Sequence, residues 1–240
     1  MFPGPCPDSP MAPTGTARNV PPPPPYRPPP NDALDLLYAD TWLLMANKPA
    51  GLLSVPGRGE DKQDCLVLRV QAEYPDALIV HRLDLPTSGL LLLARGKEMQ
   101  RRLSHEFAQR RVDKRYLAVV MGRPLSVTGT IDLPLAVDWP NHPRQKVDRR
   151  AGKPALTRYR FLSHSASDDT SRLALSPETG RTHQLRVHLQ ALGHPIVGDR
   201  LYADATTAAK SDRLLLHAEE LSFTHPATDR RMRFCSPPPF

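Results

Sequence analysis

One carboxylate, Asp84, occupies a position where a charged group needs a specific reason. It lies in the polar segment 81–89, which is flanked by the apolar runs 77–80 and 90–94. Each run has the length of a buried strand, and a proline and a glycine indicate a bend between them. An acid at a tight connection between buried strands is costly unless it is paired or takes part in chemistry. Asp84 is therefore the candidate catalytic residue; the alternative is that it only caps a turn.

A lone carboxylate of this kind permits two reactions on a sugar. It can attack C1′ as glycosidases do, or it can remove a proton. A glycosidase normally needs a second carboxyl group as acid, and none stands out in this sequence. The chain has no Gly-x-Ser-x-Gly, no Gly-x-x-x-x-Gly-Lys, no Gly-x-Gly-x-x-Gly and no His-Glu-x-x-His motif. His183 and His188 are five residues apart, off one helix face, so we expect no metal site and no cofactor.

Composition narrows the class of protein further. The chain has 240 residues, a formal net charge of +7 and 3 cysteines without a Cys-x-x-Cys motif. The basic balance favours a polyanionic partner, although charge alone does not separate RNA from DNA or a membrane surface. The few, widely spaced cysteines suggest a reducing compartment without a disulfide framework. No apolar run has transmembrane length and no signal peptide is recognisable, so we expect a soluble cytoplasmic protein.

The elements that would position Asp84 belong to one domain of mixed structure. Residues 1–30 hold thirteen of the 28 prolines and predict a disordered Pro-rich tail, with a ligand for a partner domain as the alternative. Helices are expected over 65–73, 97–111 and from Thr182 to Gly193, interspersed with hairpins. This pattern predicts an α+β fold over 31–240, with a mixed, largely antiparallel sheet and flanking helices.

Several cationic and aromatic residues are candidates for binding a polyanion. Residues 95–115 carry eight basic groups against three acidic ones, which favours a phosphate-binding surface. Arg181 would precede a helix N-terminus, where the dipole disfavours a cation, so it needs an anionic partner. Lys48, in the loop 47–57, could hold a phosphate or simply be solvated. Trp139, near Arg144, could stack on unpaired RNA or anchor its loop to the core.

Four segments together resemble the catalytic domain of the RluA family of pseudouridine synthases. They occur in the family's order and are Asn47-Lys48-Pro49, His81-Arg82-Leu83-Asp84 with Thr87-Ser88-Gly89, Lys114-Arg115-Tyr116, and Gly180-Arg181-Thr182-His183-Gln184-Leu185-Arg186. The resemblance covers residues 34–234. Family members that act on larger rRNA sites usually carry an N-terminal S4 domain, and this chain has a Pro-rich segment there instead. Segments 53–58 and 138–141 resemble the members that modify both a 23S rRNA hairpin and tRNA anticodon loops.

The resemblance implies a role for each candidate residue. Asp84 would start glycosidic cleavage of a uridine, by attack on C1′ or by deprotonation of the sugar. Tyr116 would stack on the target base and help to remove the C5 proton, and Arg181 would pair with Asp84 and keep it ionised. Arg82 would fill the gap left by the flipped base. The RNA-binding set would be Arg82, Lys48, Lys114, Arg58 and His81.

The same resemblance implies an RNA partner, no cofactor, no metal, no membrane and a monomer. Two alternatives stay open. One is a synthase of this family with a single rRNA target, and the other is a non-catalytic RNA-binding protein. A DNA-binding regulator is disfavoured, because no helix-turn-helix partner adjoins the basic segment 97–111.

Overall fold

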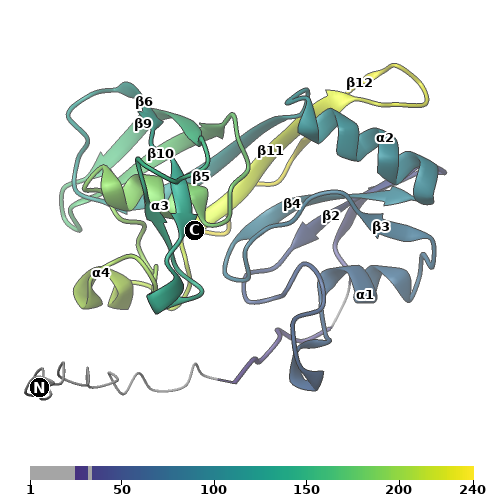
Figure 1. Cartoon of the computed structure of the whole chain (residues 1–240), viewed down its shortest axis with the longest axis horizontal. Coiled ribbons are helices and arrows are strands. Elements are labelled where there is room, and N and C mark those ends of the chain that lie inside the picture. Colours follow the sequence, from purple (N-terminus) through teal and green to yellow (C-terminus); the bar gives the residue numbers. More distant parts are fainter. Residues whose placement is uncertain (1–24, 32–33) are drawn as a thin grey trace, which may run out of the picture.

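The computed structural model of the chain describes residues 25–31 and 34–240 (Figure 1). Its main feature is a 10-stranded sheet in which β1, β2, β4, β11, β5, β10, β9 and β6 are neighbours in that order, while β3 pairs with β4 and β12 with β11. The pair β4–β11 is parallel and the other pairs of this sheet are antiparallel. The predicted α+β class with a mixed, largely antiparallel sheet is confirmed.

The strands of this sheet have the following bounds: β1 (Leu36–Ala39), β2 (Leu43–Lys48), β3 (Ala77–Ile79), β4 (Ser88–Arg95), β5 (Asp113–Met121), β6 (Thr128–Asp132), β9 (Leu156–Ser165), β10 (Thr170–Pro177), β11 (Leu216–Thr224) and β12 (Arg231–Cys235). A separate hairpin is formed by β7 (Leu135–Val137) and β8 (Gln145–Val147), with the 3-10 turn η2 (Trp139–Asn141) between them. The helices are α1 (Leu66–Gln71), α2 (Lys97–Ala108), α3 (Gln184–Ala191) and α4 (Ala205–Ala209), and a further 3-10 turn is η1 (Glu60–Lys62).

The sheet carries helices on two sides in its first half, which we define as β1–β4 with α1 and α2 (Figure 1). Leu91 and Leu93 of β4 pack into the cluster that includes the apolar residues of α1. Leu90 and Leu92 point the other way, into the cluster that includes α2. Because alternate residues of a strand face opposite sides, a strand covered on both sides needs an unbroken apolar run. This explains the sequence 90–94.

The second half comprises β6–β10, α3 and α4, and it joins the first half through the central strands β5 and β11 (Figure 1). Leu185 and Leu189 of α3 pack on Ala118 of β5 and on Leu173 and Leu175 of β10, within one buried cluster. The helix is followed by Gly193, which has a φ of 86°, a conformation that glycine adopts at little cost. The sequence predicts Thr182 as the N-cap of this helix, but the N-cap is His183 and the helix begins at Gln184.

The two halves meet where β4 runs parallel to β11. Ser88 pairs with His217 and Gly89 with Ala218. Gly89 has a φ of 110°, and a Cβ placed on it would lie 2.3 Å from the carbonyl oxygen of Ala218. A glycine is therefore required at this joint for both its backbone conformation and its close contact. Asp84 lies five residues before it.

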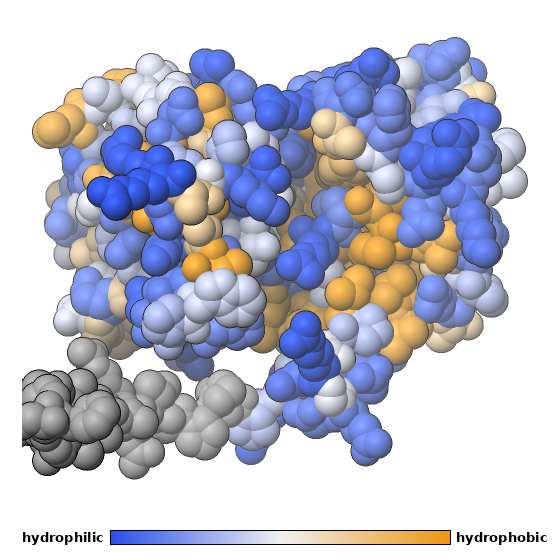
Figure 2. Space-filling model, viewed as in Figure 1, coloured by the Kyte–Doolittle hydropathy of each residue, from blue (hydrophilic) through white to orange (hydrophobic). Residues whose placement is uncertain are grey.

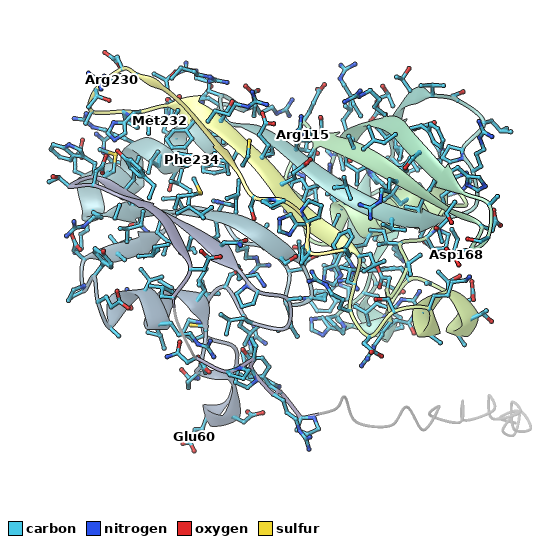
Figure 3. All side chains as sticks on the ribbon, turned by 180° about the vertical axis from the view of Figure 1, so that it is seen from behind. Glu60, Arg115, Asp168, Arg230, Met232 and Phe234 are labelled. Carbon is cyan, nitrogen blue, oxygen red and sulfur yellow. The ribbon has the colours of Figure 1, made fainter. Side chains whose placement is uncertain are left out.

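The C-terminal strands differ from the expectation. The sequence predicts separate strands over 214–217 and 221–224, and the structure has the single strand β11, with β12 paired beside it. Met232 and Phe234 of β12 pack against the α2 side of the first half (Figure 3).

Part of the proline-rich segment is docked on the first half. The Tyr26 hydroxyl donates to the carbonyl oxygen of Asp64 (2.9 Å) and accepts from the N–H of Leu53 (3.1 Å). Arg69 of α1 donates to the carbonyl oxygens of Pro29 (2.7 Å) and Pro30 (3.2 Å). The sequence predicts a disordered tail up to residue 30, but residues 25–30 lie on the first half of the sheet. The prediction for residues 1–24 lies outside the described residues. No helix within the described part of the chain is long and apolar enough to cross a membrane.

Candidate active site

A pocket of about 130 Å³ lies at the joint between the two halves. Both halves and both central strands line it: residues 82–84 and Thr87 come from the first half, residues 177 and 179–186 from the second, Lys114 and Tyr116 from β5, and Leu216 from β11. Figure 2 shows the surface hollowed between the halves, with apolar residues visible inside the hollow. The candidate catalytic residue Asp84 is thus brought together with Tyr116 and Arg181, as predicted.

The turn that carries Asp84 is held by hydrogen bonds on both sides. The N–H of Thr87 donates to the Asp84 carbonyl oxygen (3.1 Å), and Ser54 both donates to the carbonyl oxygen of Leu83 (2.7 Å) and accepts from its N–H (3.1 Å). The Asp84 side chain is 23% exposed, and no described residue donates a hydrogen bond to its carboxylate. The backbone is therefore fixed, while the carboxylate oxygens are free to act on a substrate.

Arg186 is the cation beside Asp84. Its Nε and Nη2 donate to Oδ2 and Oδ1 of Asp199 (2.8 and 2.7 Å), and its Nη1 lies 3.8 Å from Oδ2 of Asp84. The last distance is that of an ion pair rather than a hydrogen bond. Burial disfavours the charge on Arg186, but the hydrogen bonds to Asp199 and the charges of Asp199 and Asp84 outweigh it and raise its pKa. Arg186 therefore presents a permanent, oriented positive charge to Asp84.

The predicted pairing of Arg181 with Asp84 is wrong. Arg181 is exposed, and its Nε donates to the carbonyl oxygen of Pro154 (3.0 Å), although the residue does line the pocket. Its position ahead of the helix is explained by Gln184, whose Oε1 accepts from the N–H of Arg181 (3.0 Å) and from the hydroxyl of Thr179 (2.7 Å). The helix begins later than expected, and the buried arginine of its first turn takes the place beside Asp84.

Tyr202 contacts two residues of the pocket wall on the second half, His183 and Arg186. Its hydroxyl lies 2.6 Å from Nδ1 of His183 and accepts from the N–H of Gln145 (2.8 Å). The guanidinium of Arg186 lies 5.0 Å from the centre of the Tyr202 ring, within cation–π distance. His183 has a φ of 54°, and burial lowers its pKa. One tyrosine thus connects the pocket wall, the arginine and the hairpin β7–β8.

Tyr116 remains a neutral phenol at physiological pH. Burial, followed by the negative charge of Asp84, raises its pKa. The ring borders both the pocket and the cores of the two halves. It is therefore a fixed aromatic surface beside the carboxylate, and a planar base could stack on it.

Lys48 is not an RNA-contacting residue, contrary to the expectation. It is fully buried, and its Nζ donates to the carbonyl oxygens of Leu52 (2.7 Å), Pro49 (3.0 Å) and Leu85 (3.2 Å). Burial lowers its pKa to about 7. Because Leu85 follows Asp84, the lysine connects the loop after β2 to the turn that carries Asp84. Its role is structural.

His81 is also wrongly predicted as an RNA contact. Its Nε2 accepts from the N–H of Leu92 (2.9 Å), and its ring stacks on Phe107 with centroids 4.5 Å apart. Burial, and then the charge of Lys114, lowers its pKa to about 3. A neutral imidazole that serves as an acceptor inside the first half cannot meet a phosphate.

The other predicted RNA contacts differ in their position. Arg82 is exposed and lines the pocket, and Lys114 lines it from β5. Arg58 is exposed on the loop before η1 and does not line the pocket. Much of the basic excess in 95–115 is neutralised by carboxylates: Arg95 pairs with Asp76, Arg101 and Arg102 with Glu98, Arg111 with Glu106, and Arg115 with Glu219 and Glu220. Arg115 is labelled on the rear of the sheet in Figure 3.

Arg186, Asp199 and Tyr202 are the site residues that sequence reasoning missed. Arg186 belongs to one of the four resembling segments, but sequence reasoning assigns it no role. Its signal is a charged residue between Leu185 and Val187 on a helix that is buried there. Such a residue needs a carboxylate partner. Asp199, thirteen residues further along the chain, has no comparable local signal.

The comparisons with known proteins define the class of this protein as an RNA-modifying enzyme. The chain belongs to the RNA pseudouridylate synthase family, because the family model described as "RNA pseudouridylate synthase" matches residues 42–191. It is 50% identical to the dual-specificity RNA pseudouridine synthase RluA of Escherichia coli K12 over 215 residues, which are 90% of this chain and 98% of that protein. The corresponding protein of Pasteurella multocida is 46% identical with the same coverage.

A solved structure has the same fold. It is that of human RNA pseudouridylate synthase domain containing 1, with a TM-score of 0.73 and 32% identity, over 89% of this chain and 87% of the human one. The predicted family and the predicted enzymatic class are therefore confirmed.

Proposed function

We propose that the chain isomerises uridine to pseudouridine in RNA, at positions where the uridine does not lie within an RNA double helix. Asp84 would be the group that starts the reaction. The observation that carries this proposal is the arrangement of Asp84, which has free oxygens, next to the fixed charge of Arg186 and the neutral ring of Tyr116. Asp84 would act on the sugar, Arg186 would hold the carboxylate ionised, and Tyr116 would meet the base.

The reaction balances without a further reactant. The C1′–N1 bond breaks, the uracil rotates while it is enclosed, and a C1′–C5 bond forms. The proton that leaves C5 is balanced by one that N1 gains. Asp84 either adds to C1′ or removes a sugar proton, and both routes need an ionised carboxylate. The positive charge 3.8 Å away stabilises that state.

The roles of the other residues follow from their positions. Tyr116 would stack on the uracil and hold it during rotation. Arg82, exposed at the edge of the pocket, would occupy the space left in the RNA by the flipped nucleotide. Lys114 would contact the phosphate backbone of the RNA. Arg181, at the rim, would be a binding residue rather than the partner of Asp84.

The substrate proposed is both an rRNA hairpin and tRNA anticodon stem-loops. The support is that the relatives at 46–50% identity are named dual-specificity synthases and are matched over 96–98% of their length. A pseudouridine map of total rRNA and tRNA, from cells with and without the gene, tests this. Loss of the pseudouridine signal from both rRNA and tRNA in cells without the gene supports the dual substrate. Loss of the signal from only one of the two RNA classes means that the enzyme has a single target.

The variant Asp84→Asn tests the chemistry. The amide keeps the size of the side chain and cannot act as nucleophile or base, so we expect RNA binding to persist and pseudouridine formation to stop. Product analysis on a stem-loop, with the protein checked by mass for deamidation, measures this. Turnover by the intact Asp84→Asn variant would place the chemistry on another group, and an inactive wild-type protein would leave only RNA binding.

A further inference from the structure

The most exposed large aromatic residue of the described chain has no role in the site above. Trp139 is 76% exposed and lies in η2, at the tip of the hairpin β7–β8. The interpretation that it anchors its loop to the core is excluded by that exposure. An exposed indole is unfavourable in water, so a partner that covers it would gain free energy.

A second ring extends this surface. His142 lies nearly parallel to Trp139, with an interplanar angle of 16° and ring centroids 6.3 Å apart. This is an offset stacked arrangement. His142 is exposed as well. We call these two residues the aromatic platform.

The loop that carries the platform is fixed by its own hydrogen bonds. The N–H of Asp138 donates to the carbonyl oxygen of Arg144 (3.0 Å) and closes the loop. Within it, the side-chain amide of Asn141 donates to the carboxylate of Asp138 (2.8 Å), and the N–H of Asn141 donates to the Asp138 carbonyl oxygen (2.9 Å). A preorganised loop loses little entropy on binding, which favours recognition over a purely structural role.

The base of this loop is joined to the pocket. Arg144 lies 5.4 Å from the Tyr202 ring centre, and the N–H of Gln145 donates to the Tyr202 hydroxyl. The same tyrosine contacts His183 and Arg186, which line the pocket with Asp84. β8 also packs against α3. The platform is therefore connected to the pocket through Tyr202, and not through Tyr116, which lines the pocket from β5.

The surroundings of the platform are cationic. Four basic residues that follow it are exposed, and none of them forms an ion pair with another described residue: Lys146, Arg149, Arg150 and Lys153. Flat aromatic faces beside free cations are what unpaired RNA binds, because the bases stack and the phosphates meet the charges.

We propose that the aromatic platform binds an unpaired base of the substrate RNA, a neighbour of the uridine in the pocket. This rests on the proposed function, whose substrate it describes in more detail. Trp139 would thus select RNA in which the target lies in an open loop, with at least one further base free to stack.

Fluorescence tests the contact directly, because the chain has only two tryptophans. The other one, Trp42, is 45% exposed and lies just before β2 in the first half, so it is a matched control. In Trp42→Phe, a stem-loop RNA should quench the remaining indole with saturation, and a blunt duplex of equal length should not. In Trp139→Phe, the same stem-loop should leave the emission of Trp42 nearly unchanged.

Kinetics test its consequence. Trp139→Ala should raise KM for the stem-loop roughly tenfold, since that is the range of one base–aromatic stack, and leave kcat nearly unchanged. Trp139→Phe should restore most of the KM, and Trp42→Ala should alter neither constant. Equal quenching by duplex and stem-loop, or an unchanged KM in Trp139→Ala, would overturn the proposal. A wild-type protein that is quenched but forms no pseudouridine would support the platform and refute the proposed function.

Discussion

The guanidinium of Arg186 contacts two carboxylates, Asp199 through hydrogen bonds and Asp84 through an ion pair. Asp199 takes two of its nitrogens in hydrogen bonds and is itself held by the N–H groups of Leu201 (2.9 Å) and Tyr202 (3.2 Å). The third nitrogen remains for Asp84. Asp199 therefore sets the direction of the charge that Asp84 experiences.

This sharing predicts unequal effects at the two arginines. Arg186→Lys should lower kcat by about 100-fold, because an ammonium cannot keep both hydrogen bonds to Asp199 and also face Asp84. Arg181→Gln should act mainly on KM, since Arg181 lies at the rim. Steady-state kinetics on one stem-loop, with melting curves to show that both variants fold, measure this. A larger loss of kcat in Arg181→Gln would favour Arg181 as the working partner of Asp84.

His81 gives the protein a predicted sensitivity to acid. Its pKa is about 3 when folded and 6.5 for an unperturbed histidine, so between these values the unfolded chain binds one more proton. Stability from this residue is present above pH 6.5 and is lost as pH falls towards 3, with a slope of up to about 1.4 kcal/mol per pH unit.

The variant His81→Gln removes this titration and keeps an acceptor for the N–H of Leu92. Urea unfolding from about pH 7 to about pH 4 should therefore show a shallower loss of stability than the wild type. Some loss should remain, because burial also lowers the pKa of His188 and of His217. Identical slopes in both proteins would mean that folding does not lower the pKa of His81.

Sequence reasoning selected Asp84, which lines the pocket, but chose the wrong arginine beside it, and the reason is physical. A carboxylate between two apolar runs is a local signal, and residues 77–94 contain all of it. The choice between Arg181 and Arg186 depends on where a helix begins and on an aspartate far along the chain. Lys48 and His81 failed likewise, because the sequence shows that a residue is polar but not that backbone groups satisfy it inside the protein.

At the scale of elements, the joint between β4 and β11 depends on Gly89. Gly89→Ala would place a Cβ 2.3 Å from the Ala218 oxygen and also require a positive φ. We expect a loss of roughly 3 kcal/mol or more in unfolding free energy, in the range of severe core substitutions.

Gly96→Ala is the matched control for this substitution. Gly96 has a φ of 75° and a ψ of 161°, and nothing lies within 4 Å of an added Cβ, so only the backbone penalty of roughly 1–3 kcal/mol is expected. Denaturant titration of both variants gives the difference due to the close contact. Equal losses would show that β4 and β11 can separate at this point without cost.

The elements that the sequence did not predict are short strands, which only their pairing with a neighbouring strand defines. The periodicity of 97–111 predicts α2 closely, and the apolar run predicts β4. β12 was missed because Arg231, Met232, Arg233 and Phe234 alternate near a proline-rich end, and only their pairing with β11 makes them a strand. The sequence predicts a loop over 138–147, and the structure has the three-residue strand β8 at the end of this segment, paired with the equally short β7.

For the whole molecule, a net charge of +7 predicts RNA binding that weakens steeply with salt. Each lost phosphate contact should reduce the slope of log affinity against log salt by about 0.7 to 0.9. Lys114→Ala should show such a reduction, whereas Lys48→Met, which removes a buried group, should leave the slope unchanged. Fluorescence anisotropy at several salt concentrations measures both. A flat response in the wild type would mean that phosphates contribute little.

The strand order also determines when the central sheet can form during synthesis of the chain. β4 and β5 follow one another in sequence, yet β11 lies between them in the sheet, and β11 is synthesised about a hundred residues after β5 has ended. Until then, the edges that will receive β11 have no partner, and the two walls of the pocket are not joined. A nascent chain without β11 therefore contains Asp84, Tyr116 and Arg186, but these residues do not yet form one pocket. The enzyme can touch RNA productively only after its last central strand has left the ribosome.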